Sequence, residues 1–162
     1  MTSNHQVLSA RDAVRDVFDG AMVCVGGFGP IKNRPIDLLT ALSEQPNATQ
    51  LTIVSNGFPH QPLAENHQVK KLIGAFGGSV YRRAAASEEQ IRNGELEFEP
   101  SPQGIFTERL RAGAGGIAAF FSPVGAHTVV GQHGGGAHGA GRVPGSSATP
   151  PAGTPPPPSR PV

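Results

Sequence analysis

Short continuous apolar runs alternate with segments of helical periodicity over the first 130 residues of the chain. Continuous runs of this length are typical of strands buried on both faces of a parallel sheet. Leu96-Glu-Phe-Glu99 alternates instead, which predicts a half-exposed strand. The continuous runs predict strands at Ala21–Val25, Leu51–Val54, Leu72–Phe76 and Ile117–Phe121.

Apolar positions three or four residues apart predict helices between these strands. Ser9 and Ser87 are candidate N-caps, and Asp19-Gly20 and Asn93-Gly94 are candidate stops. Strand, glycine turn and helix repeat in that order, so we predict an α/β fold with an open, mainly parallel sheet and flanking helices. The expected helix faces are Ala10, Val14, Val17 and Phe18, then Leu38, Leu39 and Leu42, with a later helix over Gly104–Ala112.

The pattern stops near residue 130. Residues 131–162 contain 8 Gly and 8 Pro, no acid and almost no large apolar side chain. Such a segment buries too little surface to offset a backbone entropy of about 1–2 kcal/mol per residue. We therefore predict an ordered domain over 1–130 and a disordered Gly/Pro-rich tail over 131–162, with Pro155–Pro158 in polyproline II.

The amino-acid composition argues against several classes of function. The net charge is +1 and only 15% of residues are charged, so the basic face of a nucleic-acid binder is not expected. One cysteine, Cys24, excludes an internal disulfide and fits a reducing cytoplasm. No apolar run approaches the ~20 residues of a membrane span, and the first residues do not resemble a signal peptide. We expect a cytoplasmic chain without nucleic-acid or membrane partners.

Ligands of open α/β sheets bind off the carboxyl ends of the strands. The predicted ends are Gly26–Pro30, Ser55–Gly57, Gly77–Gly78 and Ser122–Thr128. Gly26-Gly-Phe-Gly-Pro30 is the best candidate, because its glycines let backbone N–H groups approach a phosphate or a carbonyl oxygen that gains negative charge. It is neither a dinucleotide fingerprint nor a P-loop. A tight strand-to-helix turn without a ligand remains the alternative.

No residue is a convincing nucleophile. Ser55 has no His or acid at a diagnostic spacing, and Cys24 lies inside an apolar strand, where core packing is expected. Arg109 and Arg111 could meet a phosphate, but solvent exposure is the expected fate of both. Glu95, Glu97 and Glu99 share one face, which favours a solvated surface. The six histidines are scattered, so no metal site is predicted.

Several blocks of the sequence are similar, in the same order, to the α (A) subunits of family I CoA-transferases of the 3-oxoacid type. The first block, Asp19-Gly20 to Gly29, resembles the family's signature of an apolar strand leading into Gly-Gly-Phe-Gly. The others are Leu51–Asn56, Val69–Ile73, Gly94–Glu97, Pro102–Gly104, Glu108–Gly113, Gly115–Phe120 and Pro123–Thr128. The resemblance implies the CoA-transferase (NagB-like) fold, in incomplete form.

This resemblance also implies a mechanism. In the family, CoA passes from an acyl-CoA to a free carboxylate in a ping-pong cycle through a glutamate on the partner β (B) subunit. Coenzyme A is then a substrate, no cofactor is tightly bound, and no catalytic residue is expected in this chain. A heterodimer or heterotetramer is implied. Carried over by position, the CoA-binding residues are Gly26, Gly27, Phe28, Gly29, Pro30, Ile31 and Lys32.

Two departures from the family pattern stand out. Lys32-Asn33-Arg34-Pro35 replaces a Gly-x-Pro closure of the turn, with one residue added. Family α subunits also continue with further strands, whereas the Gly/Pro/Ala/Arg bias after Gly131 suggests a truncated chain, or a GC-rich gene read in a shifted frame. Transfer from succinyl-CoA to an acetoacetate-type 3-oxoacid is the favoured function.

Three alternatives stay open. The first is the α subunit of a 3-oxoadipate CoA-transferase, and the second is an inactive truncated remnant that acts only in assembly. A sugar-phosphate isomerase of related fold is the third, and it would need its own acid/base pair.

Overall fold

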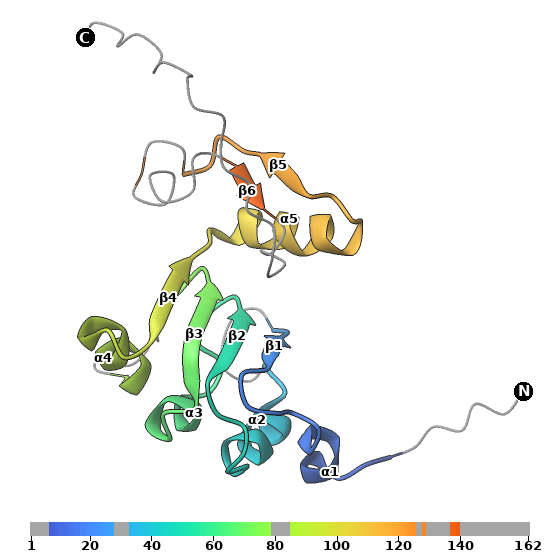
Figure 1. The fold of residues 1–162 in the computed structure, drawn as a ribbon, viewed down its shortest axis with the longest axis vertical. Helices are drawn as coiled ribbons and strands as arrows, with labels where there is room; N and C mark the ends of the chain where they lie inside the picture. Colours follow the sequence, from blue (N-terminus) through green and yellow to red (C-terminus); the bar gives the residue numbers. More distant parts are fainter. Residues whose placement is uncertain (1–6, 28–32, 79–84, 126–127, 129–136, 140–162) are drawn as a thin grey trace, which may run out of the picture.

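The computed structural model describes residues 7–27, 33–78, 85–125, 128 and 137–139. Helices and strands alternate through most of this length (Figure 1). In chain order they are α1 Ala10–Val14, β1 Met22–Val25, α2 Ile36–Ser43, β2 Leu51–Ser55, α3 Gln61–Glu65, β3 Val69–Gly74, α4 Ala86–Asn93, β4 Glu97–Pro100, α5 Gln103–Ala114, β5 Ala119–Phe121 and β6 Ala137–Gly139. The α/β class predicted from the sequence is confirmed.

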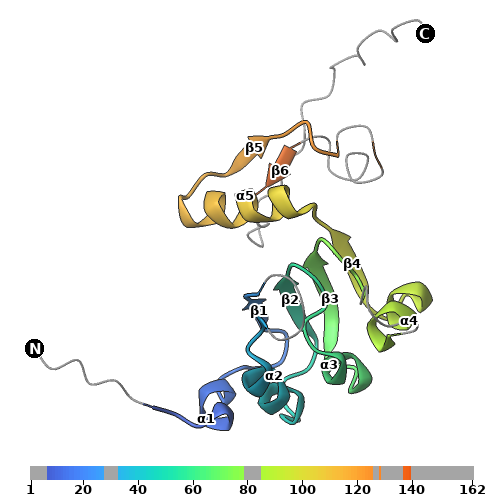
Figure 2. The same cartoon turned by 180° about the vertical axis from the view of Figure 1, so that it is seen from behind.

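Four parallel strands form the main sheet in the order β1-β2-β3-β4. Each crossover between neighbouring strands carries a helix, the arrangement that parallel pairing requires. The carboxyl ends of all four strands therefore lie on the same side of the sheet, which we call the carboxyl edge. Helix α5 lies beyond this edge in both views, whereas α2 and α3 lie towards the opposite end (Figures 1 and 2).

The core lies on one face of the sheet. Side chains alternate along each strand, and Leu51 and Ile53 of β2 and Leu72 of β3 point to the same face and are fully buried. Leu39 and Leu42 of α2 and Leu63 and Ala64 of α3 complete the cluster. Burying one leucine stabilises the fold by about 1.5–3 kcal/mol, so this cluster is the main source of stability.

Strand β1 differs from its prediction. Its continuous apolar run predicted burial on both faces, but the strand lies at the sheet edge and Met22 is 65% exposed. Cys24, on the same face as Met22, is exposed as well, so its assignment to the core is wrong. A run of apolar residues reports the strand but not how many neighbours the strand has.

Two of the four helix signals named from the sequence are confirmed, whereas α1 ends at Val14 and not at Asp19-Gly20. Ser9 caps α1 by accepting a hydrogen bond from the Asp12 amide, and Gly94 ends α4 in the left-handed conformation, with φ of 76°. Ser87 is not a cap: the N-cap is Ala85, and Ser87 is buried where the Gln61 amide donates to its Oγ at 3.2 Å. Two expected buried positions, Phe18 and Leu38, are exposed, and α3 was not predicted.

The predicted strand at 117–121 lies outside the parallel sheet. Residues Ala119–Phe121 form β5, which pairs antiparallel with β6 beside α5 (Figure 1). Strand β6 is the only part of 131–162 that the structure describes, so disorder of the remainder stays a prediction. No helix within the described residues is long and apolar enough to cross a bilayer.

Candidate functional site

The candidate site lies at the edge where the four parallel strands end. The segments that follow the strands are Gly26–Gly27 after β1, Asn56–Gly57 after β2, Ala75–Gly78 after β3 and Ser101 after β4. Gly57 and Phe76 form a parallel bridge that extends the pairing of β2 and β3 into this region. The segment predicted at Ser122–Thr128 follows β5, which lies outside the parallel sheet, so it does not follow a strand of that sheet as the sequence predicted.

Gly27 is fixed in a conformation that suits glycine alone. Its φ is 128°, a region that L-residues rarely adopt. A Cβ at this position would lie 2.6 Å from the carbonyl oxygen of Asn33 and 2.8 Å from Cγ of Arg34. The turn after β1 therefore folds back onto the segment that enters α2. Gly26 differs, since a Cβ there would have no atom within 4 Å.

Arg34 links the turn after β1 to the turn after β2. Its Nη1 donates to the carbonyl oxygen of Phe58 at 2.9 Å and to that of Pro59 at 3.4 Å. Its Nη2 lies 3.6 Å from where a Cβ of Gly57 would stand. Burial lowers the pKa of Arg34, but a guanidinium stays charged at neutral pH.

His60, the residue after Pro59, has an imidazole that is biased towards its neutral form. Burial lowers the pKa of His60, an effect that the carboxylate of Glu65 partly opposes. His60 Nε2 lies 3.4 Å from Thr40 Oγ1. Of these two side chains in the described part of the chain, Arg34 is therefore the one that carries positive charge at neutral pH.

Two side-chain amides meet at the same edge. Gln103, the first residue of α5, donates from Nε2 to Oδ1 of Asn56 at 3.0 Å. The backbone carbonyl of Asn56 also accepts from the amides of Ala75 and Phe76, which fixes the turn after β2 to the end of β3. Within the described residues Nδ2 of Asn56 makes no hydrogen bond. The pair therefore keeps N–H groups that a ligand oxygen can accept from.

Unsatisfied buried polar atoms concentrate at this edge. Four buried side-chain atoms have no hydrogen-bond partner within the described residues. Three of them are Nε of Arg34, Oγ of Ser55 and Oγ of Ser101, which come from the carboxyl ends of strands or the loop beside them. Buried polar groups are normally paired, and exceptions occur where ligands or waters bind. This concentration marks the edge as the candidate site independently of any motif.

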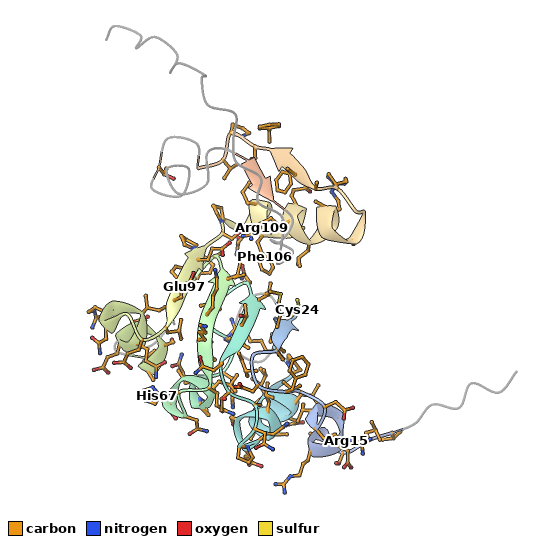
Figure 3. The ribbon with its side chains drawn as sticks, viewed as in Figure 1. Arg15, Cys24, His67, Glu97, Phe106 and Arg109 are labelled. Carbon is orange, nitrogen blue, oxygen red and sulfur yellow. The ribbon has the colours of Figure 1, made fainter. Side chains whose placement is uncertain are left out.

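An ion-pair cluster connects the sheet to α5. Lys71 of β3 contacts Glu97 at 2.8 Å and Glu99 at 2.9 Å, and Arg109 of α5 contacts Glu99 at 2.7 Å. Figure 3 labels Glu97 on β4 and Arg109 on α5, the two elements that the cluster joins to β3 and to each other. Burial opposes ionisation of Glu99, but hydrogen bonds from Lys71 and Arg109 outweigh it and lower its pKa. The cluster positions α5, and through α5 it positions Gln103.

This cluster corrects two expectations. Glu97 and Glu99 are not simply solvated, and Arg109 is only 19% exposed, since it pairs with Glu99. Arg111 is exposed, as expected, and pairs with Glu108. Sequence spacing could not reveal the first pair, because Glu99 and Arg109 lie ten residues apart on different elements.

The remaining predicted residues have mixed outcomes. Gly26 and Gly27 lie at the sheet edge, whereas Phe28, Gly29, Pro30, Ile31 and Lys32 lie outside the described residues. Ser55 is fully buried, which fits its rejection as a nucleophile. In the described part of the chain, no three His, Cys, Asp or Glu side chains gather as metal ligands would. Sequence reasoning missed Gln103 and the contacts of Arg34, whose partners are distant in the chain.

Comparisons with known proteins point to one family. A family model described as coenzyme A transferase matches residues 7–151. The chain is 40% identical over 119 residues to the A subunit of the succinyl-CoA:3-ketoacid coenzyme A transferase of Xanthomonas campestris, a match that covers 70% of this chain and 47% of that protein. A human relative, the mitochondrial succinyl-CoA:3-ketoacid coenzyme A transferase 2, is 36% identical over 129 residues, 76% of this chain and 24% of that protein. The chain spans about half the length of the bacterial relatives that it matches.

Solved structures share the fold. An acyl-CoA transferase of E. coli O157:H7, determined as a thioester complex with CoA, aligns with a TM-score of 0.61 and 27% identity over 81% of this chain and 27% of that one. A variant of the decarboxylase AibA/AibB aligns with a TM-score of 0.63 over 78% of this chain and 50% of that one. At 21% identity, the second similarity concerns the fold alone.

Proposed function

The chain belongs to the coenzyme A transferase family, and from this premise we propose that it is the α (A) subunit of an enzyme that moves CoA from succinyl-CoA to a 3-oxoacid of the acetoacetate type. The observation that carries the proposal is the family match over residues 7–151, which includes the glycine turn at the carboxyl edge. Relatives that are named as A subunits support the choice of the α over the β chain.

The proposed cycle is covalent and runs through a partner β (B) subunit. A glutamate carboxylate of that partner attacks the carbonyl carbon of succinyl-CoA. The CoA thiolate departs, and an acyl–glutamyl anhydride forms. The thiolate then attacks the glutamyl carbonyl, which releases succinate and leaves a glutamyl–CoA thioester. The 3-oxoacid carboxylate takes the place of succinate, and the steps reverse. Coenzyme A is a substrate throughout, and no tightly bound cofactor is involved.

In the proposed cycle this chain holds CoA and stabilises the developing oxyanions. Each attack places negative charge on a carbonyl oxygen, which hydrogen-bond donors fixed in advance stabilise. Backbone amides of the Gly26–Lys32 turn, the proposed CoA-binding segment, are suitable donors. Asn56 and Gln103 add amide N–H groups at the same edge.

The properties of this chain's carboxylates agree with a nucleophile that lies on another chain. All 12 acidic side chains lie in the described part, and Glu99 of β4 and Glu88 of α4 lie beside the strand ends. Two cations hold Glu99 as a depressed-pKa carboxylate, which makes it a weak nucleophile. Glu88 packs against Gly78 after β3, about 10 Å or two strand spacings from the turn after β1.

The test is co-expression with the β subunit of a bacterial succinyl-CoA:3-ketoacid transferase. The purified pair should form acetoacetyl-CoA from succinyl-CoA and acetoacetate. After incubation with succinyl-CoA alone, intact mass spectrometry should show a CoA adduct on the β subunit, and a Glu88→Gln variant of this chain should retain activity. A CoA adduct on this chain, or loss of activity in Glu88→Gln, would refute the division of roles.

A further inference from the structure

Arg34 is a partly buried cation that no acidic side chain of the chain pairs with. The described residues form seven ion pairs, and none includes Arg34. All 12 acidic side chains of the sequence lie in that described part, so no further one can supply the missing charge. Two neutral backbone carbonyls are the acceptors it has there.

The remaining donors of this guanidinium lie at the candidate site. Nη1 is occupied by the carbonyls of Phe58 and Pro59. Nη2 makes no hydrogen bond within the described residues and lies beside Gly57, where β2 and β3 end. Nε is buried and has no partner there either. Within the part of the chain that the structure describes, one edge of the guanidinium fork, Nε and Nη2, is thus left without an acceptor next to Gly27.

An unpaired buried charge is unfavourable, and so is a buried N–H without an acceptor. A ligand anion removes both penalties, because two oxygens of a carboxylate or phosphate match Nε and Nη2 in the bidentate geometry that arginine favours. A purely structural role needs only the two carbonyl contacts, for which a neutral donor would serve.

We propose that Arg34 is an anion-binding residue, whose guanidinium holds a carboxylate or phosphate group of a ligand beside the turn after β1. The inference rests on the proposed function, which supplies both kinds of group: the carboxylate of the acid and the phosphates of CoA. Arg34 belongs to the Lys32–Pro35 segment, which departs from the family pattern described from the sequence.

The experiment follows the Nε–H signals of arginine in the full 162-residue chain by NMR. Arg34→Lys assigns the signal of Arg34, and the probes are acetoacetate, succinate, inorganic phosphate, CoA and pantetheine, which lacks the phosphates. Affinities are measured for wild type, Arg34→Met, Arg34→Lys and the control Arg111→Met, whose arginine pairs with Glu108 on an exposed helix surface.

The Arg34 signal should shift with at least one of the anionic probes. Arg34→Met should weaken that binding about tenfold, the loss expected for one charge-assisted hydrogen bond, and Arg34→Lys should restore part of it. Arg111→Met should bind as wild type. Shifts with acetoacetate or succinate identify the acid as the source of the anion, and shifts with CoA but not pantetheine identify the phosphates.

The proposal for Arg34 is overturned if no anion shifts the Arg34 signal and the affinities of Arg34→Met equal those of wild type. If CoA still binds in that case, the proposed function stands. The opposite result also distinguishes anion binding by Arg34 from the proposed function. If phosphate or a carboxylate shifts the signal but neither CoA nor pantetheine binds, anion binding by Arg34 is supported and the transferase assignment is not. If Arg34→Met does not fold, the wild-type signal and Arg34→Lys still decide.

Discussion

Replacing Gly27 with alanine tests whether the turn after β1 is as tightly constrained as the structure indicates. The new Cβ would stand 2.6 Å from the carbonyl oxygen of Asn33 and 2.8 Å from Cγ of Arg34. The first neighbour is backbone and cannot move without displacing the entry to α2. Alanine would also have to adopt a φ of 128°, which costs about 1–3 kcal/mol by itself.

Together these two effects should lower the free energy of unfolding by roughly 2–4 kcal/mol. For a domain of this size, each 1 kcal/mol shifts the melting temperature by about 4–8 °C, so the loss is easily measured. Gly26→Ala is the matched control: its Cβ meets no atom within 4 Å, and its φ lies outside the left-handed range. Its stability should stay within about 0.5 kcal/mol of wild type.

Urea denaturation followed by circular dichroism gives both values on the same scale, provided that the m-values agree. Equal stability of the Gly27→Ala and Gly26→Ala variants would refute the reasoning, because they differ only in the clash and in φ. The proposed function adds a second comparison. Gly26→Ala should keep its fold yet bind CoA more weakly, since its methyl group occupies the space from which a ligand approaches.

Three further outcomes follow from the described contacts. Because the pKa of Glu99 is lowered in the folded state, its contribution to stability is complete above its ordinary value of 4.5 and is lost as the pH falls through the folded value. Glu99→Gln should thus destabilise the chain by about 1 kcal/mol at neutral pH and flatten the acid limb of a stability–pH curve, whereas the more exposed Glu97→Gln should do so less. The thiol of Cys24 should react with Ellman's reagent in the native chain nearly as fast as in urea, and slow modification would contradict its exposure. Gln68→Leu should cost about 2–4 kcal/mol in urea melts, whereas Ser101→Ala should change stability by less than about 0.5 kcal/mol, because the serine hydroxyl has no partner to lose within the described residues.

Local sequence patterns predicted which segments form strands and helices, but they did not predict which strands lie next to each other. The run Leu51–Val54 is a buried central strand, as predicted, whereas the similar run Ala21–Val25 forms an edge strand with an exposed cysteine. Both sequences satisfy the same periodicity, and only the strand order β1-β2-β3-β4 distinguishes them. Strand order depends on how the crossovers pack, which no short window of sequence records.

The candidate site was likewise predictable only in part from the sequence. Two adjacent glycines after an apolar strand carried enough information to place Gly26 and Gly27 at the sheet edge. The contacts of Arg34 with the carbonyls of Phe58 and Pro59 span more than 20 residues, and the pair of Gln103 and Asn56 spans 47. The sequence marked the first segment as a departure from the family, but its contacts became visible only after folding.

Buried polar groups are used differently at the two ends of the sheet, and this contrast locates the site. Near the amino ends, the amide of Gln68 donates to three backbone carbonyls, and that of Gln90 donates to the carbonyl of Ala64. These bonds satisfy the amide N–H groups within the chain, and Oε1 of Gln68 is the one buried side-chain atom at this end without a partner in the described residues. At the carboxyl edge, Ser55, Ser101 and Arg34 each keep a buried atom without a partner in the described residues. Three of the four unpaired buried atoms of the described residues thus lie at the carboxyl edge, which supports hydrogen-bonding capacity kept there for a molecule that binds.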